Sequence, residues 1–207
     1  ELIDNKTLSN LKINCIVLKY PDEDRQIVKE FDYGAELEYI VTKEERNLFL
    51  CNLVGHCNGN TLCLFQFVEK HGEPLYDIIS NKYKDRKVFF VYGGVSTDTR
   101  EEIREIVENE TNAIIVASYG TFSTGINIRN IDNIVFASPS KSKIRVLQSL
   151  GRGLRVGDKS RSLKVFDIAD DLSYSSRLNF TLRHFQQRLN IYDEQKFDYR
   201  IDKVKLK

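Results

Sequence analysis

The sequence has no Met and no Trp, and only three of its 207 residues are Pro. Because an open reading frame starts with Met, a chain that opens with Glu1 is expected to be a segment of a longer protein. Scarce Pro and an ordinary content of 11 Gly exclude a collagen-like chain. Hydrophobic residues make up 41% and charged residues 29%, which is typical of a globular protein that buries its own core.

Long apolar runs are also missing. No stretch approaches the roughly 18 consecutive apolar residues of a membrane-spanning helix. No basic segment followed by an apolar one opens the chain, as it would in a secretion signal. The sequence therefore indicates a cytoplasmic protein that does not contact a membrane.

Neither sign of charge is in excess, since 31 Lys and Arg stand against 30 Asp and Glu and the net charge is +1. This balance argues against a uniformly basic nucleic-acid-binding protein. The basic residues are nevertheless unevenly spread, because residues 141–161 hold many of them against the single acid Asp158. A locally basic surface is expected there.

The cysteines form no C-x-x-C pair, although three of them recur at a spacing of six: Cys15, Cys51, Cys57 and Cys63. Zinc sites in proteins use closer pairs of ligands. We therefore expect reduced thiols of a cytosolic protein and no metal site.

Short apolar runs alternate with helical patterns. The runs typical of buried strands are residues 13–20, 61–67, 87–92, 113–118, 133–137 and 163–167. The helical patterns between them cover residues 45–54, 68–80, 96–107 and 144–154. A capping box, Thr42-x-x-Glu45, is expected to open the first helix. Strands separated by helices run parallel and are buried on both faces, so we expect an open α/β sheet with its sites at the carboxyl ends of the strands.

The two ends of the chain differ from this pattern. Residues 1–35 are charged and less regular, and we interpret them as a connector. Residues 36–172 form the α/β domain, and residues 173–207 form a C-terminal extension that packs on it. Within the extension, residues 178–191 predict an amphipathic basic helix and residues 197–206 alternate as in a strand.

Two arginines stand three residues apart in Gln148-Ser149-Leu150-Gly151-Arg152-Gly153-Leu154-Arg155. This spacing puts Arg152 and Arg155 on one helix face. A guanidinium binds phosphate through two hydrogen bonds and keeps its charge at any working pH. The alternative is a solvated basic helix end that only complements the helix dipole.

Small hydroxyl-bearing residues and glycines follow the strand at 113–118, in the segment Ser118-Tyr119-Gly120-Thr121-Phe122-Ser123-Thr124-Gly125-Ile126-Asn127. A loop of this kind can offer backbone N–H groups to phosphate oxygens. The alternative is an ordinary turn whose hydroxyls cap a helix.

Together these two segments resemble motifs V and VI of superfamily 2 helicases. ASYGTFSTGIN is followed by the strand NIVFA and then by QSLGRGLR, in the order and at the spacing of that family. TLCLFQF resembles motif IV, and VYGGVS resembles the next strand and turn of the same domain. The resemblance covers residues 58–170 and is closer to DNA-directed members than to DEAD-box RNA helicases. It implies a RecA-like open parallel sheet flanked by helices, the fold of P-loop NTPase-type helicase domain 2.

The resemblance also implies a division of labour between two RecA-like domains that hold ATP between them. The sequence has no Gly-Lys pair and hence no P-loop lysine. ATP and Mg would therefore be bound mainly by an N-terminal RecA-like domain of the same protein, and this chain alone would be inactive. Two acidic clusters imitate the DExH box of that domain. We interpret Asp22-Glu23-Asp24 as a solvated turn and Asp170-Asp171 as capping acids at a helix start.

By the same resemblance, Arg152 and Arg155 are the catalytic arginines that face the terminal phosphate of ATP. Such arginine fingers contribute about 10³–10⁵-fold to phosphoryl transfer. The residues matched to nucleotide binding are Gln148, Gly151, Gly125 and Asn127. The family often has Asp where Asn127 stands.

Contacts to the DNA backbone would come from hydroxyls and helix amino ends, which bind phosphate without reading bases. The matched residues are Ser118, Thr121, Gly94 and Ser96. The resemblance thus implies the second motor domain of an ATP-dependent DNA helicase or translocase, acting on branched DNA or single-strand/duplex junctions in recombination and repair. A non-catalytic nucleic-acid-binding or regulatory module with the same fold is the alternative, and a domain for small phosphate compounds is a weaker one.

Other polar residues are given structural roles. The histidines have no nucleophile pattern around them and are expected in loops or on the surface: His56, His71 and His184. The helical spacing of apolar residues in the extension favours packing against the sheet over base stacking. Three arginines of the extension could form a duplex-binding face: Arg177, Arg183 and Arg188.

Overall fold

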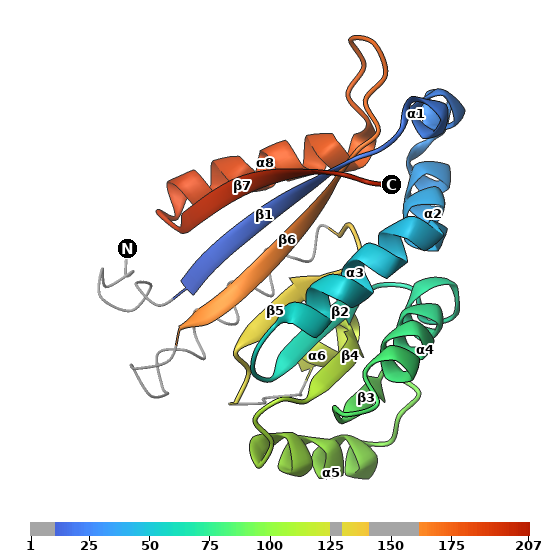
Figure 1. The fold of residues 1–207 in the computed structure, drawn as a ribbon. Coiled ribbons are helices and arrows are strands. Elements are labelled where there is room, and N and C mark those ends of the chain that lie inside the picture. Colours follow the sequence, from blue (N-terminus) through green and yellow to red (C-terminus); the bar gives the residue numbers. More distant parts are fainter. Residues whose placement is uncertain (1–10, 125–129, 141–161) are drawn as a thin grey trace.

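The computed structural model describes residues 11–124, 130–140 and 162–207. Its strands form one sheet in the order β3-β4-β2-β5-β6-β1-β7, and every neighbouring pair is parallel (Figure 1). The strands are β1 Leu11–Lys19, β2 Thr61–Phe65, β3 Val88–Val91, β4 Ile114–Ser118, β5 Asn133–Phe136, β6 Leu163–Asp171 and β7 Asp198–Lys205. The predicted open parallel α/β sheet is confirmed.

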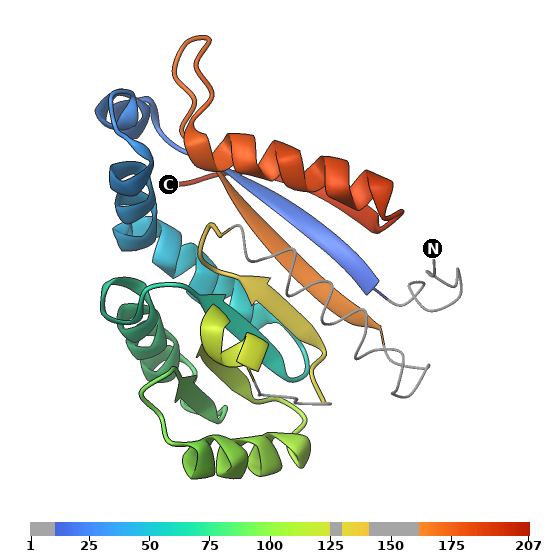
Figure 2. The ribbon, with the colours of Figure 1, turned by 180° about the vertical axis from the view of Figure 1, so that it is seen from behind.

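Helices cover both faces of this sheet. They are α1 Asp22–Val28, α2 Tyr33–Thr42, α3 Glu44–His56, the π-helix η1 Val68–Gly72, α4 Glu73–Lys82, α5 Thr97–Glu108, α6 Tyr119–Thr124 and α8 Phe180–Glu194. Buried side chains of α5 and α8 join one apolar cluster, and those of α1 to α4 join the other. Figures 1 and 2 show the two helical layers from opposite sides. The predicted helix at 144–154 lies outside the described residues.

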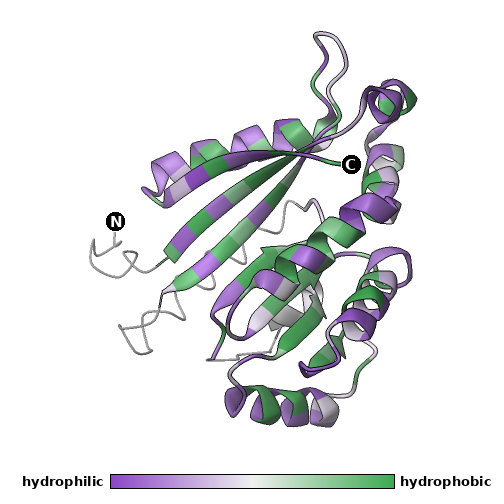
Figure 3. Cartoon of the chain, in the orientation of Figure 1, coloured by the Kyte–Doolittle hydropathy of each residue, from purple (hydrophilic) through white to green (hydrophobic). Residues whose placement is uncertain are grey.

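Burial on both faces explains the composition of the central strands. Every residue of β2 and of β5 is buried, and both strands are almost entirely apolar (Figure 3). The edge strand β7 has mostly exposed side chains and is mostly hydrophilic. Successive residues of a strand point to opposite faces, so alternate residues enter the two clusters. None of the described helices is both long and apolar enough to cross a membrane.

The chain termini contribute to the same sheet. β1 lies between β6 and β7, so the segment interpreted as a connector belongs, from Leu11 onward, to the sheet itself. The extension supplies α8 and β7, close to the predicted helix at 178–191 and strand at 197–206. Pairing of β1 with strands from the far end of the sequence could not be read from local patterns.

Three local predictions near helix ends are wrong. Thr42 ends α2 rather than capping α3, and its hydroxyl donates to the Glu38 carbonyl at 2.8 Å. Asp22 to Asp24 form the first turn of α1 rather than a solvated turn. Asp170 and Asp171 do not start a helix but end β6, where they pair in register with Leu18 and Lys19 of β1.

A buried ion pair fastens α8 to the sheet. Asp167 in β6 accepts hydrogen bonds from Arg188 Nε at 2.8 Å and Nη2 at 3.0 Å, and from the Tyr192 hydroxyl at 2.8 Å. Burial and the charge of Asp167 raise the pKa of Tyr192, so its hydroxyl remains a donor. Arg188 is therefore a structural residue, and the prediction that it belongs to a duplex-binding face is wrong.

Asp167→Ala should lower the free energy of unfolding by about 3–5 kcal/mol, because it leaves the Arg188 guanidinium buried without a counter-charge. Urea unfolding of the chain measures the change. The matched control is Arg200→Ala, which breaks the exposed ion pair with Asp202 and should cost less than about 1 kcal/mol. Equal costs for the two variants would contradict a structural role for the buried pair.

Candidate functional site

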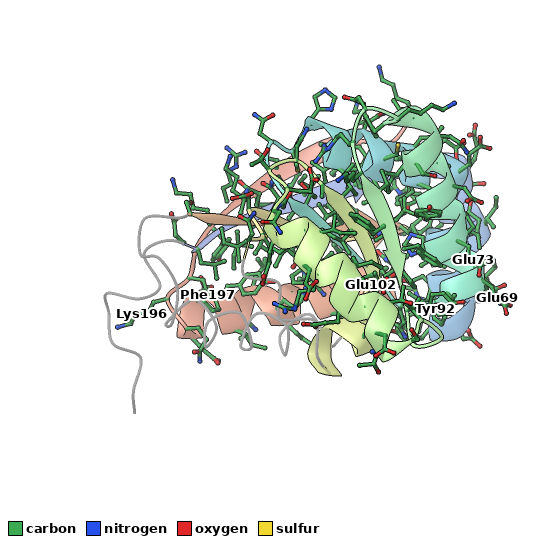
Figure 4. All side chains as sticks on the ribbon, turned by 90° about the horizontal axis from the view of Figure 1, so that it is seen from below. Glu69, Glu73, Tyr92, Glu102, Lys196 and Phe197 are labelled. Atoms are coloured by element: carbon green, nitrogen blue, oxygen red, sulfur yellow. The ribbon has the colours of Figure 1, made fainter. Side chains whose placement is uncertain are left out.

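The carboxyl ends of all described strands lie along one edge of the sheet, because the strands are parallel. In sheets of this kind ligands bind at that edge. Val91 of β3 is in register with Ala117 of β4, so the segments that follow these two strands leave the sheet side by side. In Figure 4, Tyr92 lies near Glu69 and Glu73, which follow β2, while Lys196 and Phe197, which precede β7, lie at the opposite end.

Ser118 ends β4 and is joined directly to Thr121 of α6, which begins at the next residue. The prediction of a loop is therefore wrong for residues 119–124, because the Ser118 hydroxyl and the residues after it start a helix. The hydroxyl oxygens of Ser118 and Thr121 are 2.6 Å apart, and the Thr121 backbone N–H donates to the Ser118 hydroxyl at 3.3 Å. Thr121 is only 3% exposed, whereas Ser118 is half-buried. Of the two predicted DNA-binding side chains, Ser118 is thus the more accessible, and Thr121 holds it in place.

Gly94 and Ser96 lie in the turn after the neighbouring strand β3. Ser96 is the N-cap of α5, since its hydroxyl accepts the Thr99 N–H at 3.1 Å. A Cβ on Gly94 would come within 2.5 Å of Tyr92 Cε2, so a side chain there would displace the tyrosine ring. The structure thereby brings the four predicted DNA-binding residues to the carboxyl ends of two adjacent strands, β3 and β4.

The residues predicted to face the nucleotide lie outside the described part of the chain. These are Arg152, Arg155, Gln148, Gly151, Gly125 and Asn127. Their segments follow β5 and β4 in the sequence, and both strands end at the same edge of the sheet.

A buried histidine orders the polar groups beneath this edge. His71 Nε2 is 3.1 Å from Asn47 Oδ1, and its Nδ1 is 2.7 Å from the Ser138 hydroxyl. Asn47 Nδ2 donates to the Val41 carbonyl, so Asn47 Oδ1 is the acceptor and His71 Nε2 carries the proton. Nδ1 then accepts from Ser138, whose oxygen in turn accepts the Gln66 N–H at 3.0 Å.

This arrangement requires a neutral imidazole. Burial, and secondarily the charge of Arg46, lower the pKa of His71 to about 3. A proton on Nδ1 would remove the acceptor for Ser138. The prediction that His71 lies in a loop or on the surface is wrong. His56 is exposed and His184 is half-buried beside Tyr33.

A second buried group ties α3 to the ends of β1 and β6. Arg46 donates to Asp170 from Nε at 2.7 Å and from Nη2 at 3.1 Å, and the Tyr20 hydroxyl donates to Asp170 at 2.9 Å. Burial and the Asp170 charge raise the pKa of Tyr20. Arg46 was absent from the sequence prediction, although its spacing from the buried residues Leu50 and Val54 places it on the buried stripe of α3.

All four cysteines are buried, and none forms a disulfide within the described residues. Burial raises the pKa of the Cys51, Cys57 and Cys63 thiols. Across the described ranges, no group of three or more His, Cys, Asp or Glu side chains could hold a metal ion. Reduced thiols of a cytosolic protein remain a prediction.

The low pKa of His71 makes a testable contribution to stability. Above pH 6.5 the imidazole is neutral in both the folded and the unfolded chain, so folding excludes no proton. Between pH 6.5 and 3 only the unfolded chain binds a proton at this group, so the free energy of unfolding falls as the pH is lowered. From pH 7 to pH 5 the wild type should lose about 2 kcal/mol more unfolding free energy than His71→Gln. Urea unfolding at both pH values tests this, with exposed His56→Gln as control. An equal loss in wild type and His71→Gln would contradict a neutral buried imidazole.

The sequence of this chain is similar to those of known helicases. The chain is 35% identical over 219 aligned residues to the ATP-dependent DNA helicase uvsW of Enterobacteria phage T4, covering 100% of this chain and 43% of the relative. It is 25% identical to the putative ATP-dependent helicase IRC3 of Saccharomyces cerevisiae, over 81% of this chain and 24% of the relative. The chain thus spans less than half the length of either relative.

Solved structures agree with this similarity. The crystal structure of T4 UvsW superposes with a TM-score of 0.83 at 37% identity, over 96% of this chain and 42% of that one. The C-terminal domain of the DEAD-box protein Dbp5 superposes with a TM-score of 0.57 at 12% identity, over 98% and 92% of the two chains, which shows the RecA-like fold alone. A family model described as the helicase conserved C-terminal domain matches residues 45–157. This chain belongs to the helicase conserved C-terminal domain family of superfamily 2.

Proposed function

We propose that this chain is the second motor domain of an ATP-dependent DNA helicase or translocase that acts on branched DNA in recombination and repair. The observation that carries the proposal is the similarity, over the whole of this chain, to part of a protein named as an ATP-dependent DNA helicase, at 35% identity, with a TM-score of 0.83 to the T4 UvsW crystal structure. The position of Ser118 and Gly94 at the carboxyl ends of adjacent strands supports it further.

Arg152 and Arg155 are the proposed catalytic residues. Two guanidinium groups at i and i+3 can neutralise the charge that develops on the terminal phosphate of ATP during hydrolysis. Gln148 and Gly151 would hold the arginine segment, and Gly125 and Asn127 would approach the nucleotide. Without a Gly-Lys pair in this sequence, binding of ATP and Mg would fall mainly to an N-terminal RecA-like domain of the same protein.

The turn after β3 and the junction of β4 with α6 are the proposed contact with DNA. Ser118 presents a hydroxyl, and the backbone around Gly94 and Ser96 presents N–H groups, all of which bind phosphate irrespective of base sequence. A motor that steps along any sequence needs contacts of this kind. Single-strand/duplex junctions are the proposed substrates.

Arg152→Ala or Arg155→Ala in the intact protein should reduce DNA-stimulated ATP hydrolysis by about 10³-fold or more, because each removes a charge from the terminal phosphate. DNA binding should survive. Steady-state phosphate release and fluorescence anisotropy with a labelled oligonucleotide measure the two properties. Arg161→Ala removes the same charge from the same basic segment and serves as the matched control.

Wild-type ATP hydrolysis in both variants would overturn the proposed role of the arginines. Weaker DNA binding with a shallower salt dependence would instead place them on DNA, as in a non-catalytic binding module.

A further inference from the structure

The segment between β6 and α8 projects from the carboxyl edge beside α1 (Figure 1). Tyr174 and Arg177 exchange backbone hydrogen bonds of 3.0 Å in both directions, which closes a tight turn with Ser175 in a left-handed conformation. Two further contacts fix this turn to α1 and the residue after it. Arg25 Nε donates to the Ser173 carbonyl at 2.6 Å, and the Arg177 guanidinium donates to the Lys29 carbonyl.

Three cations around this turn rest on aromatic rings. Lys29 Nζ lies 5.5 Å from the centre of the Tyr174 ring. The guanidinium carbons of Arg177 and Arg183 lie 5.8 Å and 4.6 Å from the centre of the Phe180 ring. Attraction of a cation to a ring face restrains the side chain without neutralising its charge.

These cations have no acidic partner in the part of the chain that the structure describes. Its ion pairs involve other basic residues, such as Arg25 with Asp22 and Arg188 with Asp167. The sequence contains no Asp or Glu between Asp171 and Asp193. The exposed side chains of α8 along this stretch are Arg183, Gln186, Gln187 and Asn190, all of which can donate hydrogen bonds.

A buried acid beneath the turn, Glu36, accepts four hydrogen bonds from other groups. Glu36 of α2 lines the small hollow under Tyr174 and Arg177. Its Oε1 accepts from Asn179 Nδ2 and from the Thr181 N–H and hydroxyl at 2.7–2.9 Å, and its Oε2 accepts the Phe180 N–H at 2.9 Å. These four bonds cap the start of α8, and among the described ion pairs none joins Glu36 to the three surface cations.

We propose that Lys29, Arg177 and Arg183 form a second binding surface for the phosphate backbone of the DNA strand, in addition to the segments at Ser118 and Gly94. The inference rests on the proposed function. Both surfaces lie on the carboxyl edge, and β6 is three strand spacings from β4, or about 14 Å. At about 3.4 Å per nucleotide, a strand crosses that distance in about four nucleotides. The proposed path of one DNA strand along the carboxyl edge therefore passes the ends of both β4 and β6.

Replacing all three cations, as Lys29→Ala with Arg177→Ala and Arg183→Ala, should weaken binding of a single-stranded oligonucleotide to the intact protein. Each lost phosphate contact lowers the slope of log affinity against log salt concentration by about 0.7, so the slope should fall by about 2. The matched control replaces Lys12, Lys84 and Lys164, three exposed lysines near the opposite edge, and should leave affinity and slope unchanged. Fluorescence anisotropy between 50 and 200 mM salt measures both, a range over which about 6–10 phosphate contacts change affinity by about 10³–10⁵-fold.

Unchanged affinity and slope in the triple variant would overturn the second surface, as would a loss of affinity with an unchanged slope. If Ser118→Ala still weakens binding in that case, the proposed function stands without this surface. Failure of the intact wild type to bind DNA would overturn the proposed function itself. Arg183→Ala alone, at an exposed position of α8, gives a slope change of about 0.7 and tests the surface if the triple variant does not fold.

Discussion

The common direction of the strands is the constraint on which the rest of this structure depends. Parallel strands need a crossover after each strand, and each crossover begins at the carboxyl edge. Segments from different parts of the sequence, at residues 92–96, 118–121 and 172–179, are therefore brought to one side of the sheet. The hydroxyls, helix amino ends and surface cations discussed above all belong to these segments or to the helices beside them.

Buried charge in β6 fixes both helical layers relative to that edge. Asp167 and Asp170 point to opposite faces of the sheet, because they are an odd number of residues apart. Asp167 holds Arg188 of α8 on one face, and Asp170 holds Arg46 of α3 on the other. Each pair is costly to bury but more costly to break, since a lone charge would remain in the interior. One strand thereby sets the position of helices that begin and end far apart in the sequence.

The strands and most helices could be predicted from the sequence because their signals are local. Apolar runs of strand length and helical spacing identified the described elements except the helices α1, α2 and α6, and they did not predict which strands pair with β1. The buried polar groups could not be predicted in this way. His71 meets Ser138 across 67 residues, and Arg46 meets Asp170 across 124, so no short pattern contains both partners. Asp170 was interpreted as a helix cap for the same reason, because its partner Arg46 is 124 residues away in the sequence.

The most direct test of the account is hydrogen exchange of the intact protein with and without a DNA oligonucleotide. We expect slower exchange on binding in residues 92–100, 118–124 and 172–183, which lie at or next to the carboxyl edge. Residues 57–60, 109–113 and 195–198, at the opposite edge, should be unaffected. Protection at that opposite edge, with none at the carboxyl edge, would contradict the claim that the parallel sheet gathers its nucleic-acid contacts on one side.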